Sequence, residues 1–256
     1  MLLTSLFVFM PYRRLPNTDA ARIRAMRDAQ TKGKELPPFK LAYSAKSFVK
    51  LQAFLPNFEN IYQMQRQSMS NQVNSNKEYQ EVIKKARTYI NHFLRVMNLA
   101  VQRGDLRPDT PSFFGLVNGH SSIPPLTSEK DIIEWGKEII AGESRRLNAG
   151  RTCITNPTIA VVKVHYEKFL DAWQFQKTLH KRTADYSSKI AEMRKEADEI
   201  ILELWNEVES TYSDLEEDQK RSNAEKYGLV YVFRKGELES SDNSESSIPQ
   251  HHSLGN

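Results

Sequence analysis

Few side chains in this sequence have the spacing that catalysis or metal binding requires. A di-iron carboxylate site in a helical bundle needs Glu-x-x-His motifs on facing helices, and none of the six histidines follows a glutamate by three residues. The adjacent His251 and His252 lie near the C-terminus, and the glycines never cluster as a phosphate-binding loop. Cys153 as a nucleophile with His165 as its base has no supporting signature around it. The sequence therefore predicts no catalytic residue, no metal site and no bound cofactor.

Positive charge is concentrated in the first fifty residues, which contain ten Lys and Arg against three Asp and Glu. From Glu192 onward the balance reverses, with sixteen acidic residues against seven basic ones. Clustered arginines can bind the phosphates of a nucleic acid. Opposite charges at the two ends can also attract each other within or between molecules, and this is the interpretation that we favour. The arginines that would contact a polyanion are Arg13, Arg14, Arg22, Arg24 and Arg27.

Two blocks of the sequence occur twice. Residues 62–66 (YQMQR) are matched 111 residues later by 173–177 (WQFQK), and with an offset of 108 the apolar positions of 82–98 fall on those of 190–206. Such a repeat predicts a duplicated helical hairpin. Its matched polar residues can bond across a bundle, line a polar pocket, or remain ordinary surface groups. They are Gln63 with Gln174, Gln65 with Gln176, and Asn98 with Asn206.

The apolar periodicity predicts an all-α protein, an antiparallel four-helix bundle over residues 39–235. Repeat 1 covers 39–117 with a turn in the Ser/Asn-rich stretch 68–76, and repeat 2 covers 157–233 with a turn near 180–188. A connector helix covers 128–148. Residues 1–38 form a basic segment with a short helix over about 20–30, ending before Gly33, and 236–256 form a disordered tail. Met97 and Trp205, which occupy matched positions, are expected in one common interior.

A single helix through 158–227 is the alternative to the second hairpin, because this stretch contains no Gly or Pro. We disfavour it because the spacing of the matched blocks differs by three residues, which would rotate one end of a continuous helix by about 60°. A turn absorbs that change.

Local signals place several helix ends and a short strand. Thr127 or Ser128 caps the connector helix, and Asn156-Pro157 places a proline at the first position of the next helix. Pro56 predicts a kink or a restart. The β-branched stretch 229–233 can pair with 113–117 as a small β ribbon.

Residues 12–25 (YRRLPNTDAARIRA) and 156–166 (NPTIAVVKVHY) resemble an uncharacterised family of bacterial helical proteins. The resemblance extends to the stretch YGLVY at 227–231. It implies an all-helical build and brings no activity with it. Similar proteins begin near the position of Met10, which favours Met10 as the initiator over a signal peptide formed by residues 1–10.

The overall composition, 39% hydrophobic and 27% charged, is typical of a globular protein, and no apolar run predicts a membrane-spanning helix. The single Cys153 cannot form an internal disulfide, which favours the cytoplasm; secretion is the alternative if residues 1–10 are a signal peptide. We expect a non-enzymatic helical interaction or scaffold protein with an unknown protein partner. The alternative is nucleic-acid binding through the basic N-terminal segment.

Overall fold

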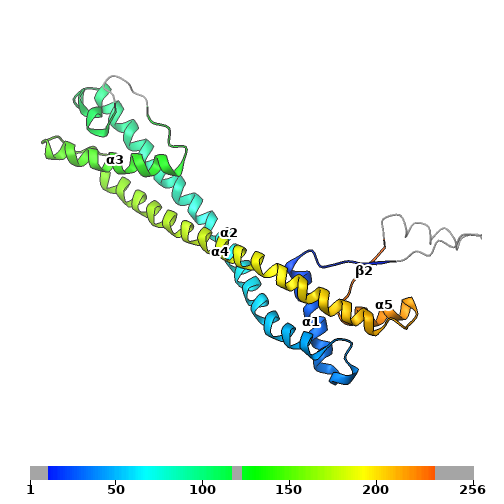
Figure 1. Cartoon of the computed structure of the whole chain (residues 1–256). Coiled ribbons are helices and arrows are strands. Elements are labelled where there is room, and N and C mark those ends of the chain that lie inside the picture. Colours follow the sequence, from blue (N-terminus) through cyan, green and yellow to red (C-terminus); the bar gives the residue numbers. More distant parts are fainter. Residues whose placement is uncertain (1–10, 117–122, 234–256) are drawn as a thin grey trace, which may run out of the picture. The chain divides into compact units, whose positions relative to one another are not determined.

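The computed structural model describes residues 11–116 and 123–233, and most of them are helical, which confirms the all-α fold class. Residues 1–10 and 236–256, for which we predicted a start segment and a disordered tail, lie outside the described residues. The helices are α1 (Asp19–Glu35), α2 (Ala45–Gln102), α3 (Glu129–Asn148), α4 (Ile159–Thr211) and α5 (Glu217–Glu225) (Figure 1). Two 3-10 helices, η1 (Pro38–Lys40) and η2 (Thr110–Phe114), and two strands, β1 (Tyr12–Arg13) and β2 (Tyr231–Val232), complete the described chain.

Two very long helices replace the four helices that the sequence predicted. α2 has 58 residues and α4 has 53, so the predicted turns at 68–76 and 180–188 are wrong. Neither stretch contains the Gly or Pro that would end a helix. Their polar residues instead bond across the helix pair: Ser68 Oγ lies 2.9 Å from Thr183 Oγ1, and Gln176 Nε2 donates to Ser75 Oγ over 2.9 Å. α2 also continues through Pro56, so the predicted restart there does not occur.

The chain forms two compact units. Unit 1 comprises Met1–Met64 with Tyr186–Asn256, and unit 2 comprises Gln65–Asp185. Each long helix therefore contributes one part to each unit, and the two parts run antiparallel inside a unit. Met97 and Trp205 are both buried but belong to separate cores, so the predicted common interior is wrong. The matched blocks 173–177 and 190–206 of α4 lie in different units, so they need not share one packed face and no turn is required between them.

The core of unit 1 lies between α1 and the unit 1 parts of α2 and α4. Met26, Phe58 and Trp205 are at most 1% exposed there. Thr18 is the N-cap of α1, and its hydroxyl accepts a hydrogen bond from the Ala21 N–H over 3.2 Å. The helix continues past the predicted end at Gly33, because a side chain at that position would overlap neighbouring aromatic rings and its absence allows close packing.

Unit 1 also contains a two-stranded antiparallel ribbon formed by β1 and β2. Tyr12 is paired with Val232, and Arg13 with Tyr231. The sequence predicted that 229–233 pairs with 113–117. That prediction is wrong for the part of 113–117 that the structure describes. Residues 113–114 belong to the 3-10 helix η2, and Val117 lies outside the described residues.

The core of unit 2 lies between α3 and the unit 2 parts of α2 and α4. α3 begins at Ser128 with a capping box closed by Asp131, as its sequence predicted. Phe114 of η2 is fully buried in this core, so η2 packs on unit 2. The predicted start of α4 at Pro157 is wrong: Asn156 adopts a left-handed φ of 55°, the Asn156-Pro157 bond is cis, and α4 begins at Ile159.

Candidate functional site: a groove between α2 and α4 in unit 2

Hydrogen bonds hold α3 against one side of the α2/α4 pair of unit 2. The Glu129 carboxylate of α3 accepts from Tyr79 Oη of α2 over 2.7 Å and from Trp173 Nε1 of α4 over 3.0 Å. Tyr166 Oη of α4 donates to the Ile133 carbonyl of α3 over 2.9 Å. The spacing of both long helices is therefore fixed from this side.

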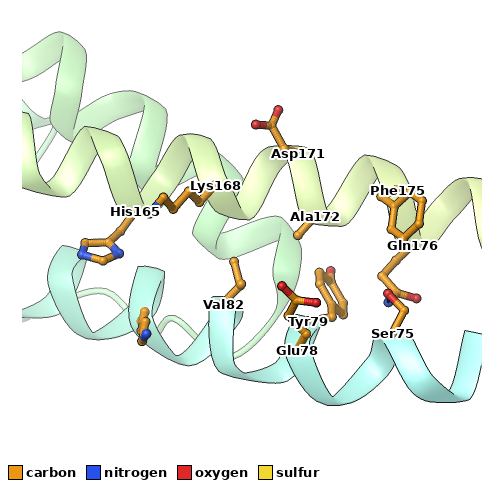
Figure 2. Close-up of a pocket in the computed structure, with 11 residues that line it drawn as sticks. Ser75, Glu78, Tyr79, Val82, His165, Lys168, Asp171, Ala172, Phe175 and Gln176 are labelled. Carbon is orange, nitrogen blue, oxygen red and sulfur yellow. Dashed lines mark hydrogen bonds between the residues drawn. The ribbon is translucent and has the colours of Figure 1, made fainter.

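The opposite side of the same helix pair carries a groove of about 650 Å³. Figure 2 looks into this groove, with α2 below, α4 above and α3 behind them. Its volume lies within the range of about 300–1,000 Å³ that is typical of ligand pockets. Val82 of α2 and Ala172 of α4 provide half-buried apolar surface in the middle of the groove. At one end, Gln176 is held by its bond to Ser75.

Exposed apolar side chains follow one face of α4, in the groove and beyond it. Phe175 lines the groove and is 54% exposed. Val164, which is 49% exposed, and Val161, which is 39% exposed, lie nearer the start of the helix, outside the residues that line the groove. Steps of three and eleven residues keep these positions on one helix face. Large apolar groups on a shared, uncovered face are unusual unless something binds them.

Positive charge gathers at the end of the groove that contains His165. Lys85 of α2 and Lys168 of α4 both line it there, and the His165 ring stacks on Tyr89 with ring centroids 4.0 Å apart. Burial lowers the pKa of His165 below its usual 6.5, and the charges of Lys168 and Lys85 lower it further. The imidazole is therefore neutral at pH 7, and the two ammonium groups give this end its charge.

Two acidic residues line the groove beyond its positive end. Glu78 of α2 lies toward the other end, whereas Asp171 of α4 follows Lys168 by one turn and lies beside the middle of the groove. In Figure 2 the Asp171 carboxylate points away from α2. The groove therefore has a positive end, an apolar middle and a more acidic end with Phe175 above it, an arrangement suited to recognition of a charged, partly apolar ligand.

Three of the five predicted polyanion-contact arginines bond to acidic residues of unit 1. Arg13 Nη1 donates to Glu209 over 2.7 Å and to Asn206 over 2.9 Å, and Arg27 pairs with Glu59. The Arg22 guanidinium donates twice to the Asp198 carboxylate, over 2.7 and 3.0 Å. Attraction between the basic N-terminal segment and the acidic C-terminal part of the chain thus occurs within unit 1.

The other two arginines, Arg14 and Arg24, are exposed beside a smaller hollow of about 300 Å³ in unit 1. Neither guanidinium makes a hydrogen bond or ion pair with another residue in the described part of the chain. Asp28 also lines this hollow; burial raises the pKa of its carboxyl group, and the charge of Arg24 opposes that change.

The matched polar residues have different environments. Gln176 is 4% exposed, whereas Gln174 and Gln63 are exposed. Gln65 and Asn98 are half-buried, and each has an interaction partner. Asn206 accepts from Arg13 in unit 1. Of the six, Gln176 is the one that lines the groove.

Sequence reasoning missed the groove, although a signal for it was present. At the start of the second repeat, Val162, Tyr166 and Phe169 form one apolar stripe, and all three are buried in the structure. Val161, Val164 and Phe175 fall outside that stripe and make a second one on the same helix. A helix with two apolar faces needs a second neighbour.

Comparison with protein-family models, with curated proteins and with solved structures finds no match for this chain. The resemblance to a bacterial helical family therefore stays a prediction. Within residues 11–116 and 123–233, no three His, Cys, Asp or Glu side chains are placed to hold a metal ion. None of the helices described is both long and apolar enough to cross a membrane.

Proposed function

We propose that this protein is a non-enzymatic helical interaction protein that binds a partner protein in the groove between α2 and α4 of unit 2. One observation carries the proposal: the side of this helix pair that α3 leaves uncovered has a groove lined by the exposed Phe175, and the exposed Val164 lies on the same face of α4. Burying apolar surface is the main favourable term in protein association, and exposed apolar patches mark such interfaces.

The bonding around the groove supports this function. Glu129 ties α2 and α4 to α3, and Gln176 ties α4 to Ser75 of α2. Both walls are therefore held in place before a partner arrives. A preformed site loses less conformational entropy on binding than a flexible one, which favours affinity.

Site-specific photocrosslinking tests the proposal. A photoreactive phenylalanine analogue is introduced at Phe175, and in a second variant at Met69, which is 51% exposed on α2 and does not line the groove. Irradiation in the native cell is expected to give discrete adducts from position 175 and none of the same mass from position 69. The position 175 adducts should disappear when Val164→Glu is added. Identical adducts from both positions, or adducts that survive Val164→Glu, contradict the proposal.

We also infer that the chain arose by duplication of a short helix followed by a long one, α1 with α2 and α3 with α4. The block at 62–66 lies in α2 and its match at 173–177 lies in α4, which supports this pairing. α1 in unit 1 and α3 in unit 2 each pack on parts of both long helices. This repeat unit replaces the hairpin that we expected from the sequence.

Nucleic-acid binding through the N-terminal segment is a second candidate function. Its support is the exposure of Arg14 and Arg24 beside the hollow of unit 1. A labelled RNA or DNA should then bind with an affinity that falls steeply with salt. The Arg14→Ala/Arg24→Ala variant should lose this binding, whereas Arg27→Ala, which removes a residue paired with Glu59, should retain most of it. Absence of nucleic-acid binding at 50 mM salt would contradict this second function.

A further inference from the structure

The shape of the groove limits what can fill it. Exposed apolar residues on the same face of α4 run from Val161, beyond the end of the groove, to Phe175 inside it, a distance of about 21 Å at 1.5 Å per residue, or roughly four helical turns. Both walls are helices, and α3 already covers their other side. A helix laid along the groove would be the fourth around a shared interior, the arrangement of a four-helix bundle.

Charge along the groove indicates the chemistry of that helix. Lys85 of α2 and Lys168 of α4 line its positive end from opposite walls, and the charges of both act on His165 between them. A carboxylate placed there would accept charge-assisted hydrogen bonds from both ammonium groups. Glu78 lies toward the other end, so a second carboxylate would be disfavoured at that end.

From this geometry we propose that the groove binds an amphipathic α-helix of about four turns, which carries an Asp or Glu opposite Lys85 and Lys168. Its apolar residues, spaced by three and four positions, cover Val164 and Phe175. This inference rests on the proposed function and specifies the class of partner. The order of positive end, apolar middle and acidic end also gives the bound helix a direction.

Designed peptides test the inference on the full-length protein. Three fluorescent 18-residue peptides share one leucine stripe: the first has Glu at the position that faces the positive end, the second has Lys there, and the third has the Glu and two central prolines. Fluorescence anisotropy at 50 mM salt is expected to show the Glu peptide binding at least tenfold more tightly than the other two. Lys85→Glu/Lys168→Glu should reverse the preference between Glu and Lys. Phe175→Glu should weaken the binding of both helical peptides, and Met69→Glu, the matched surface control, should leave it unchanged.

Several results would overturn the inference. Equal binding of the Glu and Lys peptides removes the role of the two lysines, and equal binding of the proline peptide shows that the groove takes an extended chain. Displacement of the Glu peptide by millimolar inorganic phosphate or succinate, at constant ionic strength, shows a small-anion site instead. If no peptide binds while crosslinking at Phe175 still gives its specific adducts, the inference fails and the proposed function stands. Circular dichroism of each variant confirms that it is folded.

Discussion

The buried ion pair of unit 2 leads to a quantitative prediction. Glu143 and Arg146, one turn apart on α3, have side chains that are each 1% exposed. The Glu143 carboxylate accepts from Arg146 Nε over 2.8 Å and from the Ile154 N–H over 3.0 Å, and Arg146 also donates to the Thr152 carbonyl. The pair therefore ties the end of α3 to the loop before α4. Replacing Arg146 with methionine keeps the apolar stem but leaves a buried carboxylate with one backbone donor.

The expected cost of Arg146→Met is about 3–5 kcal/mol, because breaking a buried pair leaves a charge without its counterion. At about 1.4 kcal/mol per factor of ten, the opening equilibrium of unit 2 should rise by roughly a hundredfold to a few thousandfold. Hydrogen–deuterium exchange measures this change directly. The slowest amides of α3 should lose protection by that factor, and those of α1 in unit 1 provide the internal reference.

A second variant separates charge from lost packing. Glu143→Gln/Arg146→Met keeps an amide oxygen to accept from the Ile154 N–H but buries no charge. This double variant should recover about 1–2 kcal/mol relative to Arg146→Met, since an unpaired neutral group costs less than an unpaired ion. Two results would refute the reasoning. One is a loss below 1 kcal/mol for the single variant, as for a surface pair; the other is a double variant that is no more stable than the single one.

Three further substitutions have defined outcomes. Gly136→Ala places a Cβ into the Tyr166 ring and should destabilise unit 2 by about 1–3 kcal/mol, read as faster exchange of α3 amides. Burial alone would raise the pKa of Glu207. The hydrogen bonds that its carboxylate accepts, first from Ser47 and then from Ser44, have the larger combined effect and lower this pKa. The stabilisation from this group is therefore complete above the unfolded pKa, near 4.5, and is lost as the pH falls through the folded value. In urea titrations, Glu207→Gln should make unit 1 less sensitive to acid between about pH 5 and pH 3, and an unchanged acid dependence would contradict this. Thr18→Ala should cost about 1 kcal/mol and speed exchange in the first turn of α1 only.

The features that the sequence predicted well depend on local chemistry. The start of α3 followed from Ser128 and Asp131, three residues apart, because a capping box involves a single turn of chain. A signal of the same local kind stands at the end of α2, where Gly104 has a φ of 83° just beyond the last helical residue. In both places the residues that decide the structure are sequence neighbours.

The errors came from residues whose partners are distant in sequence. Ser68 and Ser75 are typical of a turn when only neighbours are considered, yet they bond to Thr183 and Gln176, more than 100 residues away. The same applies to the groove. The second apolar face of α4 is visible in the sequence, but which face α3 covers depends on tertiary bonds such as those of Glu129.

The division of the long helices has a consequence for synthesis on the ribosome. Unit 2 is one continuous segment, Gln65–Asp185, whereas unit 1 is assembled from the chain on either side of it. Met26 and Phe58 leave the ribosome early, but Trp205, their neighbour in the same core, follows only after the whole of unit 2. At 5–20 residues per second, that interval is on the order of ten seconds. The nascent N-terminal segment must therefore keep its apolar surface shielded during that time, while unit 2 can already fold and bring the flanking segments together.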